Sequence, residues 1–247
     1  MNRQNFKSWG LLALAISPII VTFSGWQLAK AQLTPEMLIS VNFPQSGTRE
    51  PSGQTSGGGS RGPGDCASVI TNLTALMPGD DNAGTTTVSN PKFFVYLPQH
   101  QVKSAQFEIK YKSGESVYSK DLDISNTSGI VKLSLPENVS LKTNQEYSWS
   151  FSVICDSDTG DSSANRYVEG TITKVEISPE LEKSLKNATP LEQAAIYAKA
   201  RIWNETIATL AELRNCHPGE WEELLTSVGL QKLASEPFAS CCQLEEE

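Results

Sequence analysis

The hydrophobic period of this chain changes once, and that change limits the folds open to it. Between residues 66 and 177, apolar and polar residues alternate in short runs, as around Trp149 and Phe151. A period of two places alternate side chains on one face of a strand. From residue 178 onward, apolar residues recur at the three- and four-residue spacing of a helix. The sequence therefore predicts a β-rich α+β fold, with strands first and helices second.

The strand-forming runs are short and are separated by turn signals. They lie at residues 93–97, 107–111, 117–118, 130–135, 149–155 and 168–172. This spacing is typical of an antiparallel β-sandwich of the immunoglobulin or fibronectin type, which we place at residues 66–177. Leu141 and Tyr147 lie at the entry to the strongest run, with a spacing that resembles the tyrosine corner of such sandwiches.

Start signals divide residues 178–247 into a short helix and three longer ones, followed by an acidic tail. Ser178 and Thr189 each precede a proline, as N-cap residues do, and Glu192 completes a capping box with Thr189. Pro218 opens a further helix, which we expect to end near Gly229. This small C-terminal helical unit is predicted to follow the sandwich directly.

One degenerate tetratricopeptide-like helix pair is indicated within this unit. Its spacing is carried by Ala194, Tyr197, Thr206, Leu210 and Pro218. A single such pair is unable to bury its own apolar face, so we expect it to pack against the sandwich. Tyr197, Trp203 and Trp221 are then either aromatic residues of a binding surface or part of the core. The size of the two Trp rings favours the core.

Residues 1–31 have the three parts of a secretory signal peptide. Arg3 and Lys7 supply positive charge, residues 11–21 are apolar, and a small-x-small motif ends at Ala31. We predict cleavage after Ala31 and a periplasmic or extracellular mature protein. The apolar run is shorter than the roughly 20 residues that span a bilayer. No later segment is more apolar, so no membrane span is expected after cleavage.

Between the signal peptide and the sandwich, residues 32–65 are predicted to be a flexible segment. Gly, Ser and Pro dominate from residue 44 onward, with no apolar periodicity. Such a composition buries too little surface to offset the entropy of ordering. The formal net charge of the whole chain is −8. An acidic surface repels phosphate backbones, so no nucleic-acid partner is expected.

The chain has five cysteines, and export favours disulfides. They are Cys66, Cys155, Cys216, Cys241 and Cys242. We predict a Cys66–Cys155 bond and a second bond from Cys216 to Cys241 or Cys242. The remaining thiol is then free or bridges two chains. A zinc site built from Cys216, His217 and the last two cysteines is disfavoured because its ligand spacing is wrong. No metal or cofactor is predicted.

No residue is assigned a catalytic role. His100 and His217 have no serine or cysteine nucleophile in a recognisable motif. Glu222 and Glu223 lie among other acidic residues on a helix, where a solvated face is the ordinary arrangement. The aspartates within residues 156–161 are typical of a hairpin tip.

Short motifs in a fixed order run through nearly the whole mature chain. They are Gly57–Gly62, Leu73–Pro78, Pro91–Pro98, Gly129–Ile130, Tyr147–Trp149, Cys155–Asp156, Val168–Gly170, Ala195–Ala198, Ile202–Trp203, Leu210–Arg214 and Leu224–Leu225. The ordered set resembles a cyanobacterial family of exported proteins catalogued only as a domain of unknown function. Arg201 stands where that family usually has Gly, and residues 204–206 replace its usual Tyr-Asp-Ala. The resemblance implies a cyanobacterial source and export, and it carries over no activity.

These observations support three hypotheses of function. The first is a non-enzymatic module that binds an unidentified protein or cell-envelope component. The second is a hydrolase of envelope polymers that uses carboxylates, which paired acids facing one cleft would favour. The third is a structural envelope protein that is cross-linked through its spare cysteine. The sequence leaves the oligomeric state open.

Overall fold

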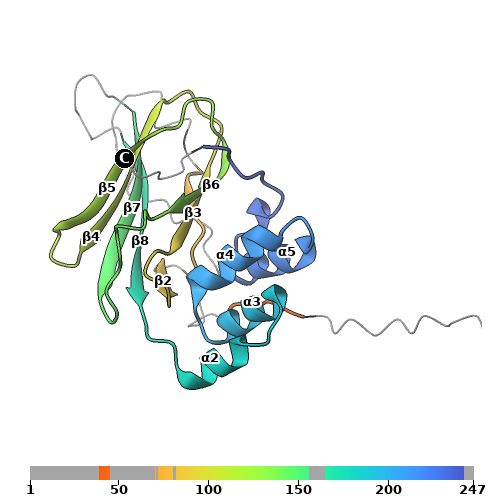
Figure 1. The fold of residues 1–247 in the computed structure, drawn as a ribbon. Coiled ribbons are helices and arrows are strands. Elements are labelled where there is room, and N and C mark those ends of the chain that lie inside the picture. Colours follow the sequence, from red (N-terminus) through yellow and green to blue (C-terminus); the bar gives the residue numbers. More distant parts are fainter. Residues whose placement is uncertain (1–38, 45–69, 71, 80–81, 156–164, 242–247) are drawn as a thin grey trace, which may run out of the picture. The chain divides into compact units, whose positions relative to one another are not determined.

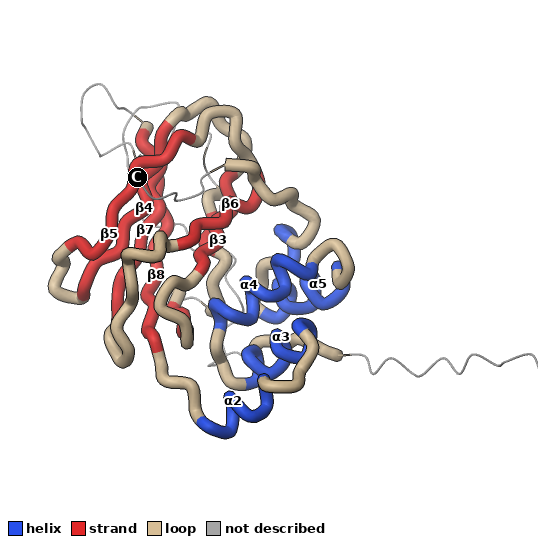
Figure 2. Tube along the Cα trace, in the orientation of Figure 1, coloured by secondary structure: helices blue, strands red, loops and turns tan. Residues whose placement is uncertain are grey.

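The chain folds into an α+β structure in which strands precede helices (Figures 1 and 2). This computed structural model describes residues 39–44, 70, 72–79, 82–155 and 165–241. Within these residues, the strands are β1 (Thr74–Ala75), β2 (Ala83–Thr86), β3 (Lys92–Leu97), β4 (Ser104–Tyr111), β5 (Ser116–Asp123), β6 (Gly129–Ser134), β7 (Glu146–Ile154) and β8 (Arg166–Lys174). The α-helices are α2 (Pro179–Leu185), α3 (Pro190–Lys199), α4 (Trp203–Leu213) and α5 (Pro218–Ser227), and a 3₁₀ helix spans Gln231–Leu233.

The strands form two sheets, of order β1-β3-β6 and β2-β8-β7-β4-β5. All pairs are antiparallel except β2 with β8, which run parallel with Ala83 opposite Thr171. The expectation of a wholly antiparallel arrangement is therefore wrong at this edge. Strand β2 has the sequence Ala-Gly-Thr-Thr, which carries no apolar alternation that could have indicated its position.

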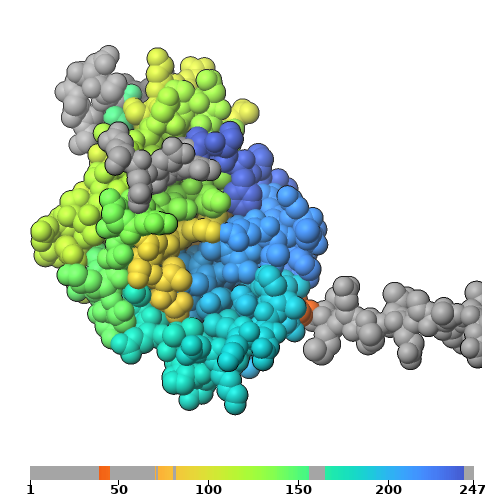
Figure 3. Space-filling view, in the orientation of Figure 1, coloured from red at the N-terminus to blue at the C-terminus, as the bar shows by residue number. Residues whose placement is uncertain are grey.

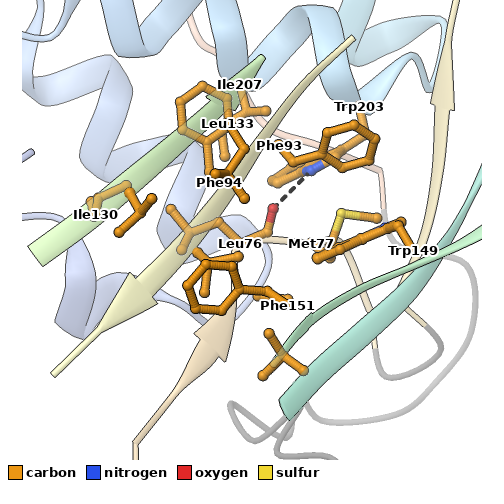
Figure 4. Packing of buried hydrophobic residues seen from close by; sticks show 14 of the residues in the cluster. Leu76, Met77, Phe93, Phe94, Ile130, Leu133, Trp149, Phe151, Trp203 and Ile207 are labelled. Carbon is orange, nitrogen blue, oxygen red and sulfur yellow. Dashed lines mark hydrogen bonds between the residues drawn. The ribbon is translucent and has the colours of Figure 1, made fainter. Parts of the chain in front are cut away.

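Aromatic side chains join the two sheets and the helices into one core. Phe93 of the smaller sheet lies 5.2 Å from Phe107 and 5.3 Å from Trp149 of the larger sheet, between ring centroids. Trp203 of α4 donates from its indole Nε1 to the Leu76 carbonyl at 3.0 Å (Figure 4). The helices therefore pack on the sheets, as their apolar faces predict.

The predicted tyrosine-corner hydrogen bond is present. The buried Tyr147 hydroxyl accepts a hydrogen bond from the Lys142 amide at 2.9 Å. We expect Tyr147→Phe to lower the free energy of unfolding by about 1–2 kcal/mol, because it leaves that amide without its partner. Urea denaturation measures the change.

Tyr111 supplies the matched control for this prediction. Its ring lies 5.4 Å from the Tyr147 ring, and its hydroxyl makes no hydrogen bond with the described residues. Tyr111→Phe is expected to change the unfolding free energy by less than about 0.5 kcal/mol. Equal effects of the two substitutions would mean that the corner hydrogen bond contributes nothing.

The helix starts lie where the sequence places them. The Ser178 hydroxyl accepts from the Leu181 amide at 3.2 Å. Thr189 and Glu192 form the predicted capping box, in which the Thr189 amide donates to the Glu192 carboxylate at 2.7 Å. These bonds satisfy amide groups that have no partner within their helices.

A Schellman motif ends α3 and turns the chain into α4. The Ile202 amide donates to the Tyr197 carbonyl and the Arg201 amide to the Ala198 carbonyl, both at 2.9 Å. Arg201 takes the left-handed position of this motif, with φ of 61°. Glycine is the residue that this position favours. Arg201 therefore carries backbone strain at this turn.

We expect Arg201→Gly to stabilise the protein by about 1 kcal/mol, because a left-handed conformation costs an L-residue about that much. For a chain of this size the melting temperature should rise by about 2–4 °C. Asn126 has a φ of 58°, and asparagine tolerates this region, so Asn126→Gly should give a smaller gain. A melting temperature unchanged by Arg201→Gly would show that the arginine side chain compensates for the strain.

Residues 39–44 form an N-terminal segment that packs on α5. Val41 and Phe43 are buried, and the Phe43 ring meets Trp203 edge-on at 5.0 Å. The Val41 amide donates to Glu223 Oε2 at 2.9 Å. The prediction of an unpacked segment over residues 32–65 is therefore wrong for residues 39–44. Val41 and Phe43 are two residues apart, so an extended backbone turns both toward the core.

Residues 237–239 form a C-terminal strap along the edge of the smaller sheet. The Ile130 amide donates to the Pro237 carbonyl at 2.7 Å, and the Ala239 amide donates to the Ile130 carbonyl at 2.9 Å. Phe238 packs against Trp221, with ring centroids 5.9 Å apart. The strap therefore supplies hydrogen-bond partners to β6, whose outer edge it covers.

Candidate functional site

A polar groove of about 380 Å³ lies between α3, α4 and the loop of residues 87–91 that joins β2 to β3. In the space-filling view, the yellow segment that contains this loop lies between the green strands and the blue helices (Figure 3). The volume falls within the range of small-ligand sites. Its lining residues are Val88, Ser89, Asn90, Pro91, Lys92, Gln193, Tyr197, Asn204, Glu205, Ala208, Thr209 and Glu212.

Glu205 is a charged residue of this groove's lining, and the residue is only 8% exposed. Its Oε1 atom accepts hydrogen bonds from the Thr86 hydroxyl at 2.8 Å, from the Thr87 amide at 2.7 Å and hydroxyl at 3.0 Å, and from the Val88 amide at 3.1 Å. Its Oε2 atom is buried and has no hydrogen-bond partner among the described residues. Since a buried charge is costly unless it is paired, Oε2 is the unsatisfied position of the site.

Contacts from several elements fix the 87–91 loop. Lys174 Nζ of β8 donates to the Ser89 hydroxyl at 2.7 Å, and the Leu141 amide donates to the Ser89 carbonyl at 2.9 Å. The Asn90 side-chain amide donates to the Pro136 carbonyl at 2.9 Å. One wall of the groove is therefore preformed.

Asn204 joins α4 to the start of β3 and lies tightly on β2. Its Nδ2 donates to the Lys92 carbonyl at 3.0 Å, whereas its buried Oδ1 has no hydrogen-bond partner among the described residues. A Cβ added to Gly84 would lie 2.8 Å from this Oδ1 atom. The oxygen thus faces the Gly84 backbone, and its close approach requires glycine there.

Tyr197 is one of the residues that line the groove. Burial, and secondly the negative charge of Glu205, raise the pKa of the Tyr197 hydroxyl above its usual value of 10.0. The hydroxyl is therefore protonated at neutral pH, and it lies within the electrostatic reach of the Glu205 carboxylate.

The two tryptophans named with Tyr197 are core residues. Trp203 and Trp221 are each 1% exposed, and the Trp221 indole donates to the Ala234 carbonyl at 3.2 Å. Of the two roles left open for these rings, a place in the core, which their size favoured, is the one that their burial supports. Trp221 borders a second cavity of about 490 Å³, where the Arg214 guanidinium lies 5.7 Å from the centre of its ring.

At the rim of the groove, Lys92 forms an ion pair with Glu212. The charged lining residues are this pair and Glu205, so the lining has a net negative charge. The carboxylates Glu222 and Glu223 do not contribute to the groove. Glu223 holds the N-terminal segment, and Glu222 borders the second cavity.

The described cysteines fall into two groups. Cys155 and Cys241 are disulfide-bonded, whereas Cys216 is a free and exposed thiol. The predicted bond from Cys216 to Cys241 or Cys242 is therefore not formed, because Cys216 remains free. Cys66 and Cys242 lie outside the described residues, so the Cys66–Cys155 bond stays a prediction.

Cys216 and His217 belong to the zinc site that the sequence disfavours. His217 lies 3.8 Å from Glu220, between Nδ1 and Oε1. No group of three His, Cys, Asp or Glu side chains suited to a metal occurs within the described residues. The aspartates of residues 156–161 fall outside those residues.

The structure defines an α+β protein whose helices close a polar, carboxylate-containing groove against a mixed sheet. Residues 56–238 match the family described as Domain of Unknown Function (DUF928), and the chain belongs to that family. Neither a curated protein nor a solved structure matches it. In the part of the chain that the structure describes, no helix is both long and apolar enough for a membrane span.

Proposed function

We propose that the mature chain is an exported, non-enzymatic binding module for a protein or cell-envelope component, and that the groove is its binding site. The observation that carries this proposal is the groove at Glu205, which has one preformed wall and a buried carboxylate with one unsatisfied oxygen. Buried polar groups without partners are uncommon in folded proteins and call for an explanation. In this proposal, a bound ligand is the partner that the unsatisfied Glu205 oxygen lacks.

The contacts inside the groove support binding over catalysis. Glu205 uses Oε1 to hold the 87–91 loop, and Ser89 accepts a hydrogen bond from Lys174 instead of donating to a base. Lys92 and Glu212 neutralise each other at the rim. In this proposal the sheets correspond to the immunoglobulin-like sandwich and α3–α4 to the tetratricopeptide-like pair. Both architectures are common scaffolds for binding sites, which is an argument from analogy.

A groove-filling substitution tests this proposal. Thr209 lines the groove, and Thr226 is an exposed threonine on α5 that does not line it. We expect the wild-type mature protein to bind saturably to an envelope preparation from its host in co-sedimentation. Thr209→Trp should weaken this binding at least tenfold, and Thr226→Trp should leave it unchanged. Binding that Thr209→Trp leaves intact would exclude the groove, and release of soluble polymer fragments would favour the hydrolase.

The exported location has its own test, the intact mass of the protein recovered from host cells. Cleavage after Ala31 leaves a chain that begins at Gln32. A mass that includes Met1 would contradict export through a cleaved signal peptide.

One observation favours another of the three hypotheses, a structural envelope protein that is cross-linked between chains. Cys216 is a free and exposed thiol, so a second chain can reach it. Under that hypothesis, the exported protein runs as a dimer on a non-reducing gel. Cys216→Ser should abolish this dimer, and a monomeric wild-type protein would contradict cross-linking.

A further inference from the structure

Glu205 lines the groove and has one buried carboxylate oxygen without a hydrogen-bond partner among the described residues, and this constrains the ligand. Glu205 Oε1 is already occupied by hydroxyl and amide donors, whereas Oε2 has no hydrogen-bond partner among the described residues. A guanidinium group achieves its strongest pairing with a carboxylate through both oxygens at once. Because only one oxygen is available, bidentate pairing of a guanidinium group with Glu205 is excluded. A donor that binds one oxygen suits this carboxylate better.

The charge of the groove and the burial of Oε2 further limit the chemical classes of ligand that fit. The lining has a net negative charge, and the whole chain carries −8, so both favour a cation. Because Oε2 is buried, the donor has to be compact and carried on a thin apolar stem. A primary ammonium group on an alkyl chain has this shape.

The neighbouring groups also suit an ammonium ion. Tyr197 presents an aromatic ring and a protonated hydroxyl near Glu205. An ammonium group donates three hydrogen bonds and is attracted to the faces of aromatic rings. Together Oε2 and Tyr197 supply an anionic acceptor, a neutral acceptor and an aromatic surface.

We propose that this groove binds a primary alkylammonium group, as carried by a lysine side chain of a partner polypeptide. The inference rests on the proposed function of the groove and names the chemical class of its ligand. The ammonium group donates to Glu205 Oε2, and its alkyl stem lies along the groove beside Tyr197. The 87–91 loop holds the carboxylate in place through Oε1.

Titration of the ¹⁵N-labelled mature protein with small probes tests this inference. The probes are the N-acetyl methylamides of lysine, arginine and norleucine, together with 1,5-diaminopentane. We expect the lysine probe to shift the amide signals of Thr87 and Val88 saturably. The arginine probe should bind at least fivefold more weakly, and the uncharged norleucine probe should cause no saturable shift. Equal binding by norleucine or tighter binding by arginine would overturn the proposal.

The diamine separates two sources of the same chemistry. Weaker binding of 1,5-diaminopentane than of the lysine probe supports a polypeptide partner. Equal binding assigns recognition to the ammonium group alone and overturns the polypeptide part of the proposal.

Glu205→Gln is the matched variant, since its side-chain carbonyl keeps an acceptor for the 87–91 loop and its amide group removes the charge. We expect it to lose lysine binding at least tenfold. Glu222→Gln, at an exposed carboxylate that does not line the groove, should lose less than threefold. If Glu205→Gln does not fold, nuclear Overhauser contacts from the lysine ε-protons to Tyr197 in the wild-type protein decide instead. Their absence at saturation would overturn the proposal.

The two proposals fail in different ways. If the lysine probe does not bind but Thr209→Trp abolishes envelope binding, then the groove is a binding site for another chemical class. If the lysine probe binds and Thr209→Trp leaves envelope binding intact, then the ammonium site is real and the envelope partner binds elsewhere.

Discussion

Trp203→Ala is expected to lower the free energy of unfolding by about 3–5 kcal/mol, the range for truncating a buried aromatic side chain. Trp203 is 1% exposed, and its ring meets Phe43 of the N-terminal segment at 5.0 Å. Its indole also donates to the Leu76 carbonyl. Truncation therefore leaves a cavity where α4, the N-terminal segment and the chain beside β1 meet. Urea denaturation followed by far-ultraviolet circular dichroism measures the loss.

Trp203→Phe separates packing from hydrogen bonding at this position. Phenylalanine fills most of the volume but provides no donor for the Leu76 carbonyl, so we expect a loss of about 1–2 kcal/mol. The alternative role of Trp203, as an aromatic residue of a binding surface, makes a different prediction. In that case Trp203→Ala would reduce partner binding and leave the unfolding free energy nearly unchanged.

Regular strands and helix starts could be predicted from local sequence because their signals are local. The alternation around Trp149 and Phe151 follows from one buried sheet face, and β7 spans Glu146–Ile154. The N-caps Ser178 and Thr189 act on amides within three residues of themselves. The tyrosine corner is also a short-range feature, with donor and acceptor five residues apart.

Other parts of the fold depend on partners that are distant in sequence. Val41 and Phe43 carry a pattern of only two residues, and their partners lie on α4 and α5. The parallel pairing of β2 and the strap along β6 depend on backbone hydrogen bonds, which any sequence can form. Because Gly, Ser and Pro dominate most of residues 32–65, the composition of that segment did not indicate that residues 39–44 are packed.

The groove was missed because its walls come from segments more than 100 residues apart, as in the bond from Thr87 to Glu205. One local signal was available. In the first turn of α4, Glu205 has the polar neighbours Asn204 and Thr206. The apolar Trp203 and Ile207 stand on either side of these three residues. All of these residues are buried. Polar residues inside an otherwise apolar helix start indicate a buried polar site, although they do not identify its partners.

Gly129→Ala is expected to lower the free energy of unfolding by about 3 kcal/mol, because a Cβ at this position collides with the C-terminal strap. Gly129 has a φ of 105°, which an L-residue rarely adopts. An added Cβ would lie 2.3 Å from the Pro237 carbonyl oxygen, which is backbone and has to move. That movement breaks the hydrogen bonds that join Ile130 to Pro237 and Ala239, worth about 1 kcal/mol each. Backbone strain adds about another 1 kcal/mol.

Gly114→Ala isolates the strain from the collision. Gly114 has a φ of 90°, and no atom lies within 4 Å of the place where its Cβ would stand. We therefore expect Gly114→Ala to cost only about 1 kcal/mol. Amide hydrogen exchange at Ile130 and Ala239 should accelerate in Gly129→Ala and stay unchanged in Gly114→Ala, because only the first displaces the strap. Equal losses in the two variants, with both amides still protected, would mean that the strap adjusts to a side chain at residue 129. In that case its pairing with β6 contributes little to stability.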